Sequence, residues 1–180
     1  MMNDFDDVSE IFSKITEEFN EPVRIGSRCE SNVYYRVEDL EDEDLNISAR
    51  YVANRILQLG GNQFPELILK LPGGYSFFAE RLAVVLSEMS PDRREVPLEQ
   101  YLESKLSNGH GERYKGYRTI LVTDVITTAR SSLEAHTKAT LRGINIICWA
   151  ALIDRTFGPG PVSVASAFTG APVRLLTELA

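Results

Sequence analysis

The sequence has few of the residues that build covalent or metal-mediated cross-links. It contains only two cysteines, Cys29 and Cys148, and two histidines among its 180 residues. The cysteines lie far apart and lack the short spacing of metal ligands, so we expect both to be buried or reduced thiols. A disulfide-rich scaffold and a cysteine-based metal module are therefore not indicated.

Long apolar runs and an excess of basic residues are also missing. No run approaches the roughly 18 residues of a membrane-spanning helix. The acidic start, MMNDFDDVSEIF, lacks the basic and apolar regions of a secretory signal. Nineteen Lys and Arg against 26 Asp and Glu give a formal net charge of −7, which disfavours nucleic acid or an anionic membrane as the main partner. We expect a cytoplasmic protein, in which a local basic pocket can still hold phosphates.

What the sequence does contain is enough apolar material for one domain. With 43% hydrophobic residues, we expect residues 1–180 to form a single unit around one core. Apolar residues at helical spacing predict helices in the segments 7–19, 44–61, 75–89 and, after Thr123, through Leu141. Residues 1–30 would form an N-terminal helix and its lead-in, with Val8, Ile11, Phe12, Ile15 and Phe19 on one helical face.

Apolar runs without polar alternation predict strands between these helices. They lie in the segments 65–71, 119–123, 144–153 and, more weakly, 160–168. Such strands are typical of an α/β fold whose largely parallel, twisted sheet is flanked by helices on both faces. Residues 91–117 are polar, charged and mostly without period, so we interpret them as a small hood-like excursion that includes a loop.

The stretch RTILVTDVITTARSS, residues 118–132, places polar residues where a buried strand ends and a helix begins. In parallel sheets, ligands bind beyond the carboxyl ends of the strands. Asp124 is suited to ribose hydroxyls or a metal-bound water, and Thr127, Thr128 and Ser131 lie beside the free N–H groups of a helix N-terminus, which attract phosphate. The same threonines and serine are also favoured simply as helix caps. From these residues alone, both interpretations stay open.

The segment ILVTDVITTARSS resembles the phosphoribosyl pyrophosphate (PRPP) binding motif of type I phosphoribosyltransferases, and its DVITT form is similar to orotate phosphoribosyltransferases in particular. Other segments match that family in the expected order from about Ser31 onward: SNVYY, LILKLPGGYSFFAERLAVVL, SKLSNGHGE and ALIDRTFG. The resemblance implies the type I phosphoribosyltransferase fold, a homodimer, and transfer of phosphoribosyl from PRPP to a base such as orotate with release of pyrophosphate. It also implies Mg²⁺, held mainly by PRPP rather than directly by the protein.

The resemblance assigns roles to individual residues. The PRPP-binding residues would be Thr123, Asp124, Thr127, Thr128, Ala129, Arg130 and Ser131, and the pyrophosphate loop would be Pro72, Gly73 and Gly74. Lys105 and His110 would act with Asp124 in catalysis, from a hood that closes over the pyrophosphate. Tyr34, Tyr35 and Arg155 would contact the base.

The motif is degenerate, which leaves a second function open. Thr123 replaces the first residue of the family's acidic pair, and Ala129 and Arg130 replace residues that begin with a flexible glycine. In the hood, basic residues are replaced by Ser104 and Asn108, and Gly26 falls near the position of a base-binding lysine. We therefore expect slow turnover with orotate if the chain is an enzyme. The alternative is a catalytically impaired module on the same fold that binds PRPP or a nucleotide or has a regulatory role.

Overall fold

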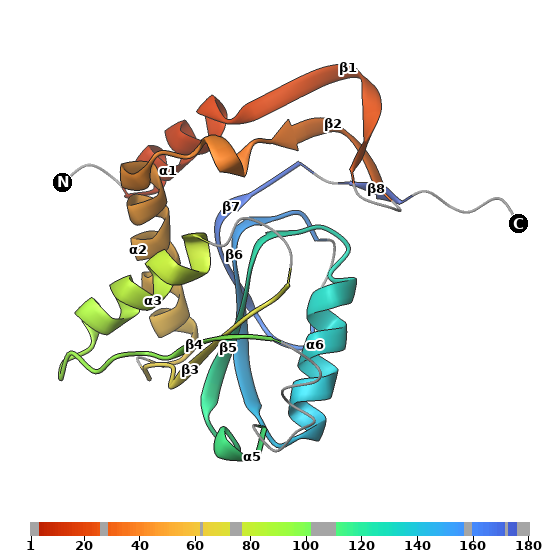
Figure 1. Cartoon of the computed structure of the whole chain (residues 1–180). Helices are drawn as coiled ribbons and strands as arrows, with labels where there is room; N and C mark the ends of the chain where they lie inside the picture. The colour runs from red at the N-terminus through yellow and green to blue at the C-terminus, as the bar shows by residue number, and fades with distance from the viewer. Residues whose placement is uncertain are drawn as a thin grey trace, which may run out of the picture.

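The computed structural model describes residues 4–25, 29–61, 63–72, 77–101, 111–156, 160–171 and 173–175. Within these ranges the chain forms one main sheet, one small sheet and helices on both sides of the main sheet (Figure 1). The helices are α1 (Asp4–Lys14), α2 (Asp42–Leu59), α3 (Phe77–Met89), the short α5 (Gly111–Arg113) and α6 (Arg130–Leu141), with a 3₁₀ helix η1 (Val37–Asp39). No helix of this described part is long and apolar enough to cross a membrane.

The main sheet has five parallel strands in the order β4-β3-β5-β6-β7. Their bounds are β3 (Leu67–Lys70), β4 (Leu98–Gln100), β5 (Arg118–Ile126), β6 (Asn145–Asp154) and β7 (Val164–Thr169). The strand around Leu121 is therefore central, and the predicted α/β fold with a parallel sheet is confirmed. Most residues of β5 and β6 are buried, and only one residue of the two strands is exposed, as expected of strands that are covered on both faces.

Two apolar clusters lie on opposite faces of this sheet. Alternate strand residues such as Ile120 and Val122 pack with α1, α2 and α3 on one face. Their neighbours, including Leu121 and Trp149, pack with α6 on the other face. This alternation follows from the two-residue period of a strand, and Figure 1 shows α2 and α3 on one side of the sheet and α6 on the other.

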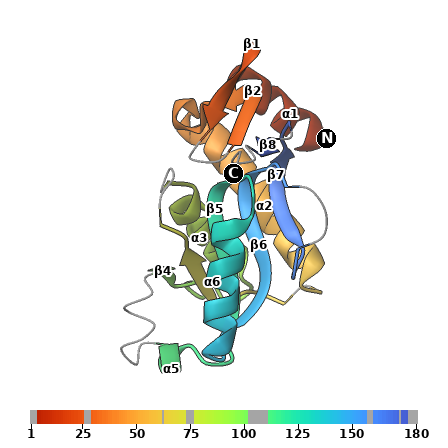
Figure 2. The ribbon, with the colours of Figure 1, turned by 90° about the vertical axis from the view of Figure 1, so that its right-hand side faces the viewer.

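A small antiparallel sheet lies beyond the carboxyl ends of the main strands. Its order is β1-β2-β8, with β1 (Thr16–Ile25), β2 (Cys29–Tyr35) and β8 (Arg174–Leu175). Figure 2 shows β1, β2 and β8 above the upper end of the main sheet. This small sheet was not predicted from the sequence, because β1 alternates between half-buried and exposed residues and lacks an apolar run.

The N-terminal helix is confirmed, but its predicted length is wrong. Val8, Ile11 and Phe12 are buried on one face of α1 as expected, yet the helix ends at Lys14 and Phe19 lies in β1. The segment 91–117, predicted as a hood-like loop, contains β4, which extends the main sheet in parallel with β3. Both cysteines are free and buried, as expected.

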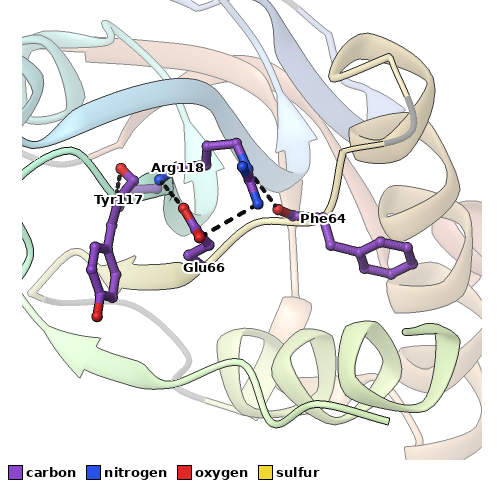
Figure 3. A network of polar contacts seen from close by, with 5 residues as sticks. Phe64, Glu66, Tyr117 and Arg118 are labelled. Carbon is purple, nitrogen blue, oxygen red and sulfur yellow. Dashed lines mark hydrogen bonds and ion pairs between the residues drawn. The ribbon is translucent and has the colours of Figure 1, made fainter. Parts of the chain in front are cut away.

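The amino-terminal ends of β3 and β5 are joined by polar contacts. The carboxylate of Glu66 accepts a hydrogen bond from the backbone N–H of Arg118 at 3.0 Å and lies 3.5 Å from its guanidinium. The Nε of Arg118 also donates to the backbone carbonyl of Phe64 at 3.0 Å. Figure 3 shows this network, in which the Thr119 hydroxyl also donates to the carbonyl of Tyr117. These contacts fix the register of two central strands at the sheet end opposite the polar turns.

Candidate functional site

A cavity of about 460 Å³ opens where β3 and β5 end and the small sheet begins. The residues that line it come from three places in the chain: Tyr34, Val37 and Glu38; Leu71 and Pro72; and Thr123 to Ser132. Register explains the second and third groups, because Lys70 pairs with Val122 and Leu71 donates its backbone N–H to the Val122 carbonyl at 2.9 Å. Leu71 and Pro72, which follow β3, therefore lie beside the polar end of β5, as predicted.

The turn from β5 into α6 exposes a helix N-terminus to this cavity. The N-cap residue is Ala129, whose methyl group makes no side-chain capping bond. The first turn of α6 contains no acidic residue, whereas the first turn of α2 contains three. The partial positive charge of the α6 N-terminus is therefore not matched by an acidic side chain of its own first turn. This arrangement favours phosphate binding over simple capping by threonine and serine.

Ala129 adopts a backbone conformation that glycine prefers. Its φ is 57° and its ψ is 1°, in the left-handed region, where an L-residue with a Cβ is disfavoured by roughly 1–2 kcal/mol. The turn therefore keeps the backbone shape that a glycine-containing motif would have, although the sequence has alanine. Its carbonyl accepts the Leu133 N–H at 2.8 Å, the first helical bond of α6.

Asp124 and Thr123 differ in their exposure although they are neighbours on β5. Asp124 is buried, and its carboxylate forms part of the cavity lining. Thr123 is half-buried and also lines the cavity. Further along the turn, Thr127 is half-buried, while Thr128, Arg130 and Ser131 are exposed. This part of the cavity thus has hydroxyls, a guanidinium and helix N–H groups near Asp124.

The residues from the small sheet and η1 form the other part of the lining. Tyr34 is 38% exposed at the end of β2, and it is followed by the half-buried Val37 and the exposed Glu38 of η1. An aromatic ring, an apolar side chain and a carboxylate together suit a planar ring that carries polar edges. The sequence singled out Tyr34 for this role but missed Val37 and Glu38, because nothing in their local pattern indicates that η1 packs against the cavity.

Arg155 and Tyr35, both expected to contact the base, lie in a buried joint between the two sheets. Arg155 is 3% exposed, and its guanidinium donates to the Ser31 hydroxyl at 2.6 Å, the Val33 carbonyl at 3.2 Å and the Ala171 carbonyl at 2.6 Å. Burial lowers the pKa of this guanidinium. Neither Arg155 nor Tyr35 is among the described residues that line the cavity.

The remaining predicted residues lie outside the described residues. They are Gly73 and Gly74 of the pyrophosphate loop and Lys105 and His110 of the hood. Pro72, the one described member of that loop, is exposed at the cavity edge. Leu71 and Ser132 also line the cavity and were not predicted; Ser132 is buried in the first turn of α6.

The described residues fit a Mg²⁺ ion that is carried by a phosphorylated ligand. They contain no group of three or more His, Cys, Asp or Glu side chains that would cage an ion. Mg²⁺ commonly binds through one or two carboxylates together with substrate phosphates and water. Asp124 offers one carboxylate in the cavity, so the donor set suits a shared ion better than a resident one.

Comparisons with known proteins identify the fold. The chain is 19% identical to an orotate phosphoribosyltransferase from Aeropyrum pernix, with 90% of this chain and 93% of that chain covered and a TM-score of 0.61. It is 16% identical to the Mycobacterium tuberculosis orotate phosphoribosyltransferase in complex with inorganic phosphate, with 92% of this chain and 95% of that chain covered and a TM-score of 0.62. It is 14% identical to an HGPRT-ase from Leishmania tarentolae in complex with GMP, with 72% of this chain and 78% of that chain covered and a TM-score of 0.56.

No family model and no curated protein matches the sequence. The structural likeness at these identities establishes the fold alone: the chain has the type I phosphoribosyltransferase fold.

Proposed function

We propose that this protein binds PRPP and transfers its phosphoribosyl group to a nitrogenous base, with release of pyrophosphate. The observation that carries the proposal is the cavity in which the α6 N-terminus, the carboxylate of Asp124 and the aromatic ring of Tyr34 come together. A phosphate, a ribose and a planar base are the three parts that such a lining suits. Solved structures with this fold include one with inorganic phosphate and one with GMP, which is consistent with a phosphate at this place.

Each part of the lining has a distinct task in the proposed reaction. The α6 N-terminus and the hydroxyls of Thr127 and Thr128 would bind the 5-phosphate. Asp124 would accept hydrogen bonds from the ribose hydroxyls, which holds C1 of the ribose toward the Tyr34 side of the cavity. The C1–oxygen bond to pyrophosphate breaks with its electron pair on the leaving oxygen, and a ring nitrogen of the base bonds to C1 and loses its proton. The protein contributes mainly positioning.

Pyrophosphate leaves with high negative charge. Mg²⁺ bound together with PRPP would neutralise part of that charge. Leu71 and Pro72 bring the turn after β3 to the cavity, so we infer that pyrophosphate lies along this turn. Lys105 and His110 remain our sequence-based proposal for further cationic groups, together with the homodimer that the resemblance implies.

A second candidate function is a module that binds PRPP without efficient turnover. The observation that favours it is the strained N-cap, since Ala129 at φ 57° adds a methyl group to a phosphate turn that glycine suits better. Thr123, which lacks a charge, stands beside Asp124 in the same cavity. Under this alternative, PRPP affinity is retained and pyrophosphate release with every base is at background.

Two measurements on the same preparation test the proposal. Calorimetry with PRPP and Mg²⁺ should show saturable binding, and a coupled assay should show pyrophosphate release with at least one of orotate, uracil, adenine or hypoxanthine. Binding without release supports the second candidate. A folded protein that binds no PRPP would overturn both functions and leave only the fold.

A further inference from the structure

Arg155, the cation that was expected to bind an anionic base, makes structural contacts within the protein. The Arg155 guanidinium donates three hydrogen bonds to oxygen atoms of the protein itself, on Ser31, Val33 and Ala171. Its Cζ also lies 5.2 Å from the ring centroid of Tyr35. A guanidinium with five N–H donors in a fixed fork cannot turn to a ligand without losing these contacts. Arg155 is therefore a joint between the sheets and not a free cation.

The charge at the Tyr34 side of the cavity is negative. Among the described lining residues, the acidic and basic side chains are those of Glu38, Asp124 and Arg130. Arg130 belongs to the α6 N-terminus, where its guanidinium would pair with the proposed 5-phosphate. Glu38 belongs to η1 and lies on the side that Tyr34 and Val37 share. An anionic ring placed beside Tyr34 would therefore meet a carboxylate and no described cation.

From this geometry we propose that the cavity takes an uncharged base that donates N–H hydrogen bonds, and that Glu38 is the residue that selects it. The inference rests on the proposed phosphoribosyl transfer and names its substrate class. Tyr34 would cover the face of the ring, Val37 its apolar edge, and the carboxylate of Glu38 would accept an N–H of the ring or of an exocyclic amino group.

Two effects make Glu38 discriminate. A carboxylate that accepts an N–H bond from a neutral ring forms a charge-assisted hydrogen bond, which is stronger than a neutral one. The same carboxylate repels a carboxylate on the ligand, and the repulsion grows as the ligand displaces water from the cavity. Both effects favour the uncharged base, so removing the charge of Glu38 should weaken binding of the uncharged base and strengthen binding of the anionic one.

Uracil and orotate are a matched pair of probes, because they differ only in the carboxylate on the ring. We expect kcat/KM with uracil to exceed that with orotate at least tenfold in the unmodified protein. Glu38→Gln should reduce this ratio about tenfold, and Glu38→Lys should reverse the preference toward orotate. If release of pyrophosphate is slow, calorimetry of each base against the PRPP-loaded protein gives the preference as a ratio of the two affinities instead.

Asp39→Asn is the control variant. Asp39 is the next residue of the same 3₁₀ helix and is exposed, and its carboxylate lies 3.9 Å from the guanidinium of Arg36. It is not among the described lining residues of the cavity, so its neutralisation should leave the uracil to orotate ratio unchanged. An equal change in both variants would mean that long-range charge, and not Glu38 itself, sets the ratio, which overturns the assignment.

The outcomes separate this inference from the proposed function. A protein that binds PRPP and prefers orotate, with a ratio that Glu38→Gln does not change, loses the inference but keeps the function. A protein that binds no PRPP loses the function. Preference for uracil or a purine that Glu38→Lys abolishes supports both.

Discussion

Tyr35 and Arg155 bind the two backbone polar groups of one residue, Ala171. The backbone N–H of Ala171 donates to the Tyr35 hydroxyl at 2.7 Å, and the Ala171 carbonyl accepts from the Arg155 Nε at 2.6 Å. Arg155 itself also donates its backbone N–H to the carbonyl of Ile126 at 2.8 Å, at the end of β5. A single residue thereby connects β5 to the small sheet that supplies Tyr34. The same joint leaves little space: a Cβ on Gly170 would come within 2.7 Å of Ile153.

Truncation of this joint should destabilise the protein. Arg155→Ala removes three buried hydrogen bonds, to two backbone carbonyls and to the Ser31 hydroxyl, and we expect a loss of about 2–4 kcal/mol in the free energy of unfolding. Arg155→Lys should fall between this variant and the unmodified protein, because one ammonium cannot reach all three oxygens. Urea denaturation at neutral pH measures the loss. Arg50→Ala is the comparison, since it removes an exposed pair with Glu88 at 2.8 Å and should cost at most about 1 kcal/mol.

Neutralising Asp124 should weaken PRPP binding. Asp124→Asn retains the shape of the side chain but removes the charge that strengthens its bonds to ribose hydroxyls, so we expect at least a tenfold higher Kd, about 1.4 kcal/mol. Calorimetry with Mg²⁺ and PRPP measures it. Glu134→Gln is the control, because Glu134 is an exposed carboxylate of α6 that pairs with Lys138 at 2.7 Å. An unchanged Kd in the Asp124 variant would remove Asp124 from the binding site.

Glycine at position 129 should relieve backbone strain. Relief of the left-handed conformation gains roughly 1–2 kcal/mol, from which the greater freedom of glycine in the unfolded chain subtracts about 0.4–1 kcal/mol. We expect Ala129→Gly to stabilise the protein by about 0.5–1 kcal/mol and to bind PRPP more tightly, since the turn loses a methyl group. Ala83→Gly within α3 should instead destabilise by about 1 kcal/mol. Thermal and urea unfolding of both variants test this contrast.

Stability should fall at alkaline pH because of Cys148. Burial raises the pKa of this thiol to about 12, whereas an unfolded thiol titrates near pH 8.5. Above about pH 9 the unfolded chain therefore binds fewer protons than the folded chain, and the free energy of unfolding decreases by up to about 1.4 kcal/mol per pH unit until the folded pKa is reached. Urea unfolding from pH 8 to 10 measures the slope, which Cys148→Ala should reduce. A native Cys148 that reacts with a thiol reagent as fast as the unfolded chain would contradict the prediction.

The sequence predicts those parts of this fold in which local pattern and burial coincide. The apolar runs of β3, β5 and β6 are buried on both faces, and the polar turn after β5 lies at the edge where parallel strands meet. β1 was missed because only one of its faces packs, and β8 because it has two residues. Phe19 keeps the helical spacing of α1 but lies in β1, in the irregular stretch between the paired residues Glu18 and Val23.

The position of the base-side residues could not be predicted from local pattern. Arg155 contacts Ser31 and Val33 across more than a hundred residues, and such contacts exist only once both sheets have formed. The lining by Val37 and Glu38 has the same origin, because η1 is placed by the strand that precedes it. By contrast, the structure brings Asp124 and the residues from Thr127 to Ser131 to one cavity, because strand, turn and helix are adjacent in sequence; their binding roles stay predictions.

The pairing of β8 with β2 has a consequence for the order of assembly during synthesis. Glu30 pairs with Arg174, so the small sheet is complete only after nearly the whole described chain has left the ribosome. A two-stranded hairpin such as β1 with β2 is marginal alone in water, whereas every strand of the main sheet precedes β8 in the chain. The side of the cavity that β5 and α6 line would therefore be formed before its Tyr34 side, so a nascent chain would hold a half-built cavity until its last described strand has paired.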